Sequence, residues 1–246
     1  MTIALVDGDL IAYINAVSAI GAEEWVAKHR ASVMLDRILG EVKCDSYRVF
    51  ISGGNNFRKQ INPDYKSHRP PPPEHLVACQ QMLINKWGAE VTKDFEADDM
   101  LGIEQTDDTI ICSIDKDLLM IAGKHYSWEI KRKGKVSREA FFTTVEPDVG
   151  LKHFYKQMII GDKADNLFGV RNKGEAYAEK NLPLGNEDLM ICITKELYID
   201  DAVGGVQDRP DLEQAALERW QMNADCFWIW RELGVTYSVR EDMRED

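Results

Sequence analysis

Two short segments of this 246-residue sequence together carry five carboxylates. Phe95–Asp99 reads FEADD and Ile114–Asp117 reads IDKD. Between them, Thr109–Ser113 is β-branched and apolar, which predicts a buried strand that ends just before Asp115. FEADD alone also fits the acidic first turn of a helix, where the helix dipole favours carboxylates. Taken together, so many negative charges would repel one another strongly without a cation among them, and carboxylate oxygens suit hard divalent cations.

The elements around these segments predict an α/β fold with a central, mostly parallel sheet and flanking helices. Ile3–Val6 reads as a buried strand that places Asp7 at its carboxyl end, where ligands of such sheets bind. Further strands are expected at 47–52 and 89–92, and helices at 23–40 and 76–87. His29 lies among the apolar positions of the first of these helices and is expected to be structural.

A basic and aromatic strip lies between the second strand and the second helix. Phe57–Arg69 contains four cations and two aromatic side chains, a mixture that suits a phosphate backbone and an unpaired base. A solvated basic loop is the alternative interpretation. The stiff segment Pro70–Pro73 and the helix that follows it predict a lid or arch over 57–88. A basic hairpin over 124–138 is a weaker candidate for phosphate contact.

The second half of the chain predicts two helices joined by a glycine-containing turn. A helix over 151–159 leads into Gly161–Asn166, which reads GDKADN, and then into Gly169–Gly174 and a helix from about Glu175. This arrangement is typical of modules that grip a DNA backbone through main-chain N–H groups. Helices over 187–198 and 210–233 are expected to follow, the latter capped by Asp208 and stopped at Gly234.

Composition sets limits on the class of protein. The net charge is −12, and residues 185–246 hold fifteen acidic and six basic side chains, so −9 of it lies at the C-terminal end. The five cysteines are scattered, which favours free thiols. Without a long apolar segment or a signal-peptide pattern, we expect a cytoplasmic protein with no membrane contact. The predicted domains are 1–145, an α/β core that includes the basic segment, 146–185, a helix-turn-helix-like subdomain for a nucleic-acid duplex, and 186–246, acidic helices that pack on the core.

The motifs resemble one known family when they are taken in order. Asp7, the YKSHR segment of 65–69, FEADD, IDKD and GDKADN are similar to the 5′-nuclease superfamily of flap endonucleases and 5′→3′ exonucleases, most of all to the stand-alone bacteriophage enzymes. The resemblance covers about residues 3–180. It implies a PIN-like nuclease core with a helix-hairpin-helix-like subdomain, and a substrate of DNA with a free 5′ end or a 5′ flap, in replication, recombination or primer removal.

The resemblance also implies site residues and cofactors. Two divalent ions are expected, Mg²⁺ with Mn²⁺ able to substitute. The implied ligands of the first are Asp7, Glu96, Asp98 and Asp115, and those around the second are Asp99, Asp117, Asp162 and Asp165. Lys66 and Arg69 are expected to act in catalysis together with Asp115. The expected nucleic-acid contacts are Arg58, Lys59, Tyr65, Lys66, Arg69 and Lys173.

Two departures and two rival functions accompany this interpretation. The family's carboxylate at the end of the second strand is missing from Ile51–Gly54, which predicts a weaker hold on the first metal. The family's glycine-rich turn is altered at 169–174. A nucleic-acid-binding module without catalysis and an aspartyl-phosphate phosphatase, suggested by Asp7-Gly8-Asp9, are the alternatives. The sequence does not distinguish a DNA substrate from an RNA–DNA hybrid, and it does not identify a protein partner of the acidic C-terminal helices. If a phage encodes the chain, the expected location is the host cytoplasm.

Overall fold

The computed structural model describes residues 1–132, 135–204 and 210–245. The tip of the predicted basic hairpin at 133–134 and the predicted cap Asp208 lie outside the described residues. The chain divides into two compact units. We call residues 1–56, 70–118 and 122–145 the sheet unit, and residues 57–69, 119–121 and 146–246 the helical unit. The basic strip 57–69 therefore groups with the C-terminal half of the chain, whereas the sequence had placed it with the core.

A six-stranded sheet forms the centre of the sheet unit, with strand order β3-β2-β1-β4-β5-β8. All neighbouring pairs are parallel except β5 with β8. Ala4, Leu5 and Val6 are buried because strands lie on both sides of β1 and helices cover its faces. The predicted α/β class is confirmed. The strands are β1 (Ile3–Asp7), β2 (Ser46–Ile51), β3 (Glu90–Val91), β4 (Thr109–Cys112), β5 (Gly123–Ser127) and β8 (Phe141–Val145).

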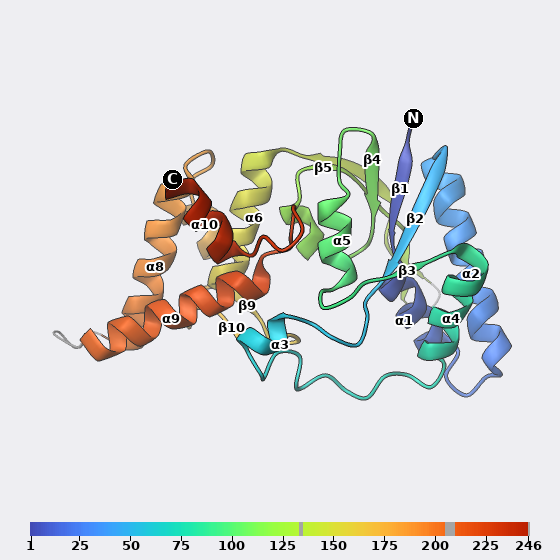
Figure 1. Cartoon of the computed structure of the whole chain (residues 1–246), viewed down its shortest axis with the longest axis horizontal. Coiled ribbons are helices and arrows are strands. Elements are labelled where there is room, and N and C mark those ends of the chain that lie inside the picture. Colours follow the sequence, from blue (N-terminus) through green and yellow to red (C-terminus); the bar gives the residue numbers. More distant parts are fainter. Residues whose placement is uncertain (133–134, 205–209, 246) are drawn as a thin grey trace. The chain divides into compact units, whose positions relative to one another are not determined.

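Helices cover both faces of this sheet (Figure 1). α1 (Gly8–Ser18), α2 (Glu24–Val42) and α4 (Leu76–Trp87) share one hydrophobic core with the strands. α5 (Ala97–Ile103) packs on the other face, against β1 and β2. The sequence did not predict α1. It follows β1 without a loop because position 8 is glycine, where a Cβ atom would lie 2.6 Å from the carbonyl oxygen of Phe50.

The buried face of α2 differs in part from the predicted one. Leu35 and Ile38 are buried as predicted, but three of the six buried positions are small residues, among them Ala27 and Ala31, which let the helix approach the core closely. Trp25, His29 and Val33 are exposed instead. The expectation that His29 is a structural histidine is therefore wrong.

The predicted hairpin over 124–138 divides into two parts. β5 joins the main sheet and buries Tyr126. The hairpin itself is shorter, with β6 (Ile130–Arg132) paired antiparallel to β7 (Lys135–Arg138).

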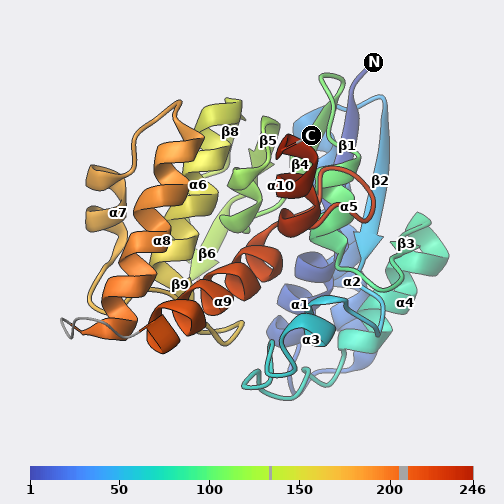
Figure 2. The same ribbon diagram turned by 60° about the vertical axis from the view of Figure 1, so that its left-hand side comes forward.

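The helical unit is built around buried aromatic side chains. Trp228 meets Phe154 edge-on, with ring centroids 5.1 Å apart, and Tyr237 stacks on Phe154 at 5.3 Å. Helix α9 ends at Phe227, not near Leu233 as predicted, because the chain turns so that Trp228 enters this cluster. Figure 2 shows α6, α8 and α9 from a second side. The elements are α3 (Arg58–Ile61), α6 (Pro147–Ile160), β9 (Gly161–Asp162), β10 (Leu167–Phe168), α7 (Glu175–Asn181), α8 (Glu187–Val203), α9 (Pro210–Phe227) and α10 (Tyr237–Glu245).

No helix in the described part of the chain has the length and apolar character needed to cross a membrane.

Candidate active site

Asp7 occupies the carboxyl end of the central strand β1 and begins helix α1. Its Oδ1 accepts the backbone N–H of Leu10 at 3.0 Å, so the side chain caps the helix. Its Oδ2 accepts the hydroxyl of Ser113 at 2.8 Å. Both contacts fix the carboxylate at the edge of the sheet, where only 2% of the residue is exposed.

Ser113 links Asp7 to the IDKD segment. Besides donating to Asp7, its Oγ accepts the backbone N–H of Asp115 at 3.0 Å. Oδ1 of Asp115 in turn accepts the backbone N–H of Asp117 at 2.9 Å. Asp7 and Asp115 are thus held at the same edge of the sheet, as the parallel strands β1 and β4 predicted. The sequence did not single out Ser113, whose place directly after an apolar strand was the available signal.

The electrostatics of this edge are those of crowded negative charge. Burial, together with the charges of Asp9 and Asp115, raises the pKa of Asp7 to about 7, although the hydrogen bonds from Leu10 and Ser113 act to lower it. Burial also raises the pKa of Asp9, and the charge of Glu96 adds to the rise. The negative charges at this edge therefore interact with one another. They come from β1, the first turn of α1, the segment after β4 and the residue before α5.

The FEADD segment forms the start of α5, as predicted. Glu96 is the residue before the first turn, with extended backbone, and it makes a capping box with Asp99. Oδ2 of Asp99 accepts the backbone N–H of Glu96 at 3.0 Å, and Asp99 is fully buried. Asp98 is half-buried on the same turn.

The GDKADN segment forms a tight turn between the short strands β9 and β10 of the helical unit. Oδ1 of Asp162 accepts the backbone N–H groups of Ala164 at 2.6 Å and of Asp165 at 3.3 Å. Asp165 faces the basic strip 57–69 of the same unit. Since the two segments are about one hundred residues apart in sequence, the fold of the helical unit brings them together.

Three side chains of the YKSHR segment contact the carboxylate of Asp165. The hydroxyl of Tyr65 donates to its Oδ2 at 3.1 Å, and Nη2 of Arg69 lies 2.5 Å from its Oδ1. Nζ of Lys66 lies 3.8 Å from the same carboxylate. Tyr65 is buried, whereas half of the Arg69 side chain is exposed. The two predicted catalytic cations thus share one anionic partner.

Two other predicted nucleic-acid contacts differ in their surroundings. Lys59 is exposed on α3. Arg58 is 2% exposed, and its guanidinium donates to the carbonyl oxygens of Cys226 at 2.7 Å and Trp228 at 3.0 Å. The prediction that Arg58 contacts nucleic acid is therefore wrong, because its charge is used inside the helical unit.

The turn over 169–174 keeps a tight conformation despite its altered sequence. Asn172 adopts a left-handed backbone with φ of 59°, a conformation that asparagine tolerates in place of glycine. Arg171 is tied to Asp201 of α8 through its Nε at 2.7 Å. Nζ of Lys173 lies 4.1 Å from the ring centre of Tyr177, so this predicted nucleic-acid contact lies at the start of α7.

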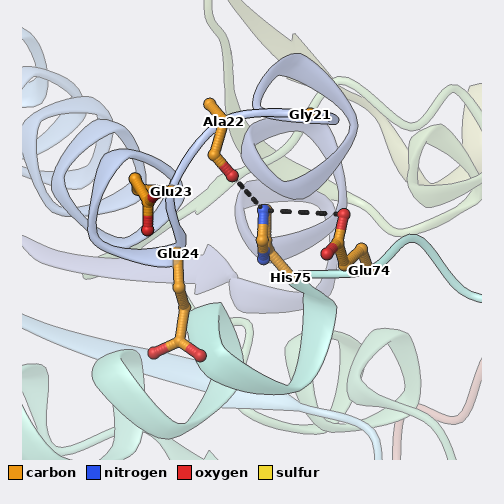
Figure 3. A pocket seen from close by; sticks show the side chains of 6 residues that line it. All are labelled: Gly21, Ala22, Glu23, Glu24, Glu74 and His75. Carbon is orange, nitrogen blue, oxygen red and sulfur yellow. Dashed lines mark hydrogen bonds and ion pairs between the residues drawn. The ribbon is translucent and has the colours of Figure 1, made fainter.

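A cavity of about 480 Å³ lies elsewhere on the sheet unit (Figure 3). His75 contacts the carbonyl oxygen of Ala22 at 2.9 Å and lies 3.9 Å from a carboxylate oxygen of Glu74. The cavity is lined by residues of the α1–α2 loop and of the segment before α4, and it contains none of the predicted site residues.

The donor chemistry of the sheet edge fits divalent cations. In the part of the chain that the structure describes, no three His, Cys, Asp or Glu side chains already form a metal-binding group. The groups at the edge are carboxylates, the ligands that Mg²⁺ and Mn²⁺ prefer. Since Asp7 is buried among the charges of Asp9 and Asp115, a bound cation would offset the repulsion that raises its pKa.

Comparison with known proteins identifies the family. Residues 2–146 match the family of the 5′-3′ exonuclease N-terminal, resolvase-like domain. The chain belongs to this family. The expected relationship to 5′→3′ exonucleases and flap endonucleases is thereby confirmed, and the carboxylates of β1, α5 and the segment after β4 all lie within the matched residues.

Relatives in sequence agree with this assignment. DNA polymerase I of Bacillus caldotenax is 28% identical over 204 residues, 72% of this chain and 23% of that protein. DNA polymerase I of Streptococcus pneumoniae is 30% identical over 166 residues, 61% of this chain and 19% of that protein. The chain thus spans about a quarter or less of these polymerases.

Two solved structures share the fold at low sequence identity. A flap endonuclease of bacteriophage T5, solved with DNA and metal ions, has a TM-score of 0.56 at 15% identity and covers 89% of this chain and 99% of its own. The catalytic core of Rad2, solved with a DNA substrate, has a TM-score of 0.53 at 15% identity and covers 99% of this chain and 87% of its own.

Proposed function

We propose that this chain is a divalent-metal-dependent 5′→3′ nuclease that hydrolyses phosphodiester bonds at DNA 5′ ends or 5′ flaps. The observation that carries the proposal is the pair Asp7 and Asp115, joined through Ser113 at the carboxyl edge of the sheet. The carboxylates at this edge lie within the residues that match an exonuclease family. The enzyme would act in replication, recombination or primer removal in the cytoplasm, that of the host if a phage encodes it.

The proposed cofactors are two Mg²⁺ ions, replaceable by Mn²⁺. When bound, such ions lower the pKa of a coordinated water and offset charge on the phosphate and on the leaving 3′-oxygen. The first ion is assigned to Asp7, Glu96, Asp98 and Asp115. The second is assigned to Asp99, Asp117, Asp162 and Asp165. In support of the first set, Asp7 is buried with its pKa raised, so a metal would replace the proton that a buried carboxylate otherwise favours.

The proposed task of Lys66 and Arg69 is to bind the scissile phosphate and stabilise its developing charge. Their common contact with Asp165 supports this role, because it holds both cations at one point of the helical unit. Tyr65 lies beneath Lys66, whose Nζ is 4.8 Å from the tyrosine ring centre. Lys59 and Lys173 are proposed as further backbone contacts, which read no base sequence. An RNA–DNA hybrid is therefore also a candidate substrate.

A gel assay with two substrates tests the proposal. A 5′-labelled flap duplex and a blunt duplex are incubated with Mg²⁺, with Mn²⁺ and with EDTA. We expect short 5′ products with either metal and none with EDTA, and the ratio of the two substrates gives the structural preference. Binding of both duplexes without cleavage under every metal condition would refute the nuclease and favour a binding module.

A single substitution tests the metal site itself. Asp115→Asn removes one negative charge but keeps a side-chain oxygen that can accept the N–H of Asp117. We expect cleavage to fall at least a hundredfold while DNA affinity in EDTA stays within about twofold. Asp36→Asn, the same change at an exposed position of α2, is the matched control. Unchanged turnover in Asp115→Asn would remove this residue from the site.

A further inference from the structure

Three segments of the sheet unit meet at Ser52, the residue that follows β2. The backbone N–H of Ser52 donates to Oδ2 of Asp9 at 3.0 Å. Its hydroxyl oxygen accepts the backbone N–H of Ala97, the first residue of α5, at 2.9 Å. Ser52 therefore connects the first turn of α1 with the first turn of α5.

The hydroxyl of Ser52 has a fixed direction because of these contacts. Its oxygen accepts the N–H of Ala97, and the hydroxyl lies near the carboxylate of Asp9. Asp9 thus accepts the main-chain N–H of Ser52, and the side chains of Ser52 and of Gln80, on α4, lie close to it. A carboxylate tied to the residue that also contacts α5 is well suited to fix its neighbours in place.

The backbone at Gly53, just after Ser52, leaves no room for a side chain that could replace Asp9 in this contact. A Cβ atom at Gly53 would lie 2.2 Å from the carbonyl oxygen of Thr92. The N–H of Gly53 instead approaches the hydroxyl of Thr92 at 3.3 Å. The packing of this chain therefore excludes a carboxylate side chain at position 53. The carboxylate that contacts the end of β2 is instead Asp9, from the first turn of α1.

We propose that Asp9 is a positioning residue of the metal centre. By fixing Ser52, Asp9 fixes the first turn of α5, and with it the positions of Glu96 and Asp98, two of the proposed metal ligands. This role rests on the proposed function, since it concerns the same metal site. It assigns Asp9 to the support of metal ligands, through its contact with the N–H of Ser52, and not to the ligands themselves.

Four variants and one control test the proposal by metal affinity. Mn²⁺ binding to the DNA-free protein is measured by calorimetry or by the loss of the free-ion signal in electron paramagnetic resonance. We expect Asp9→Ala and Ser52→Ala each to weaken Mn²⁺ binding about tenfold, the size of effect seen when partners of metal ligands are removed. The double variant is expected to be no weaker than either single one, because both break the same connection.

The conservative variant Asp9→Asn separates positioning from direct coordination. Its amide oxygen still accepts from Ser52, so we expect Mn²⁺ affinity within about threefold of wild type. Ser32→Ala is the matched control. Ser32 lies on α2, and its hydroxyl oxygen accepts from Lys86 at 2.7 Å and from Trp87 at 3.1 Å, both on α4. We expect this control to lower the unfolding temperature of the metal-free protein without changing Mn²⁺ affinity.

The possible outcomes lead to different conclusions. If Asp9→Asn binds Mn²⁺ as weakly as Asp9→Ala, the charge acts on the ion directly and the positioning role is overturned. Wild-type affinity in both Asp9→Ala and Ser52→Ala would overturn it as well. If Asp9→Ala does not fold, Ser52→Ala decides alone. In each of these cases the wild-type chain still binds metal and cleaves DNA, whereas a wild-type chain that binds no Mn²⁺ would overturn the proposed function and this inference together.

Discussion

Replacing Arg58 by alanine is expected to unfold the helical unit more easily and to leave the DNA-binding surface intact. The guanidinium is buried and donates to the carbonyl oxygens of Cys226 and Trp228. Hydrogen bonds made by a charged group contribute about 1.5–3 kcal/mol each, and their loss leaves two buried carbonyls to be satisfied otherwise. Release of a buried charge from a dry site offsets part of this loss. We therefore expect a net destabilisation of about 3–5 kcal/mol.

This free energy corresponds to a large change in thermal unfolding. For a chain of this length, 1 kcal/mol shifts the unfolding temperature by roughly 2–4 °C, so the expected decrease is about 6–20 °C. The assay is circular dichroism on heating, together with fluorescence anisotropy of a labelled flap duplex in EDTA at a temperature where both proteins are folded. Arg69→Ala is the comparison, since it removes the same charge from a side chain that is 52% exposed. There we expect a shift of less than about 3 °C and weaker DNA binding.

The reverse pattern would refute the reasoning. If Arg58→Ala melts within about 2 °C of wild type and loses DNA affinity as Arg69→Ala does, then Arg58 turns outward in solution and the sequence-based prediction holds after all. Arg58→Lys is informative beside it, because a lysine can reach one of the two carbonyls but lacks the planar fork that reaches both. We expect this variant to lie between alanine and wild type.

Two further substitutions separate catalysis from packing. Lys66→Ala should slow cleavage at least tenfold with little effect on unfolding. Lys180→Ala, which removes a lysine on α7, should leave the cleavage rate in the gel assay unchanged. Equal cleavage rates in the two variants would indicate that the basic strip is an ordinary solvated loop. Gly53→Ala should destabilise the protein by about 1–3 kcal/mol in urea unfolding, because its methyl group would overlap the carbonyl of Thr92. Gly54→Ala, where a Cβ atom has no neighbour within 4 Å, should unfold like wild type, and equal midpoints for the two variants would show that the backbone moves freely at this turn.

Strands β1 and β4 were predictable because each is a short apolar run next to a turn signal, whereas β5 was expected only within a hairpin and β8 was not predicted. Ile3–Val6 and Thr109–Cys112 needed no tertiary information, since buried parallel strands are apolar on both faces. Helix α1 was missed because Asp7 has two tasks, as the last residue of β1 and as the cap of α1. A strand that turns into a helix without a loop leaves no polar segment in the sequence to mark the boundary.

The sequence predicted which side chains belong to the candidate site, but only partly which contacts each of them makes. The carboxylates follow strands or begin a helix, which the sequence shows, and the start of α5 at Glu96 was foreseen. The burial of Arg58 was not, because its acceptors lie 168 and 170 residues away in the chain. Among four cations in one strip, no local pattern tells which one turns inward. The contact of Asp9 with Ser52 was not predicted for the same reason, since Ser52 lies on another element.

Asp165 shows how a metal-binding pattern and a structural contact can use the same side chain. The GDKADN motif predicted that Asp165 is a metal ligand. In the structure its carboxylate contacts Tyr65, Lys66 and Arg69. A carboxylate has four lone-pair directions, and these three donors use at most three of them, so a metal ion can share the side chain. Because a phosphodiester, like a carboxylate, offers two anionic oxygens to a guanidinium or an ammonium group, a DNA substrate is a suitable new partner for both cations. The substrate-binding and metal-binding roles proposed for the helical unit are therefore coupled through one residue, and Asp165→Asn is expected to change both metal affinity and DNA affinity where Asp115→Asn changes only the first.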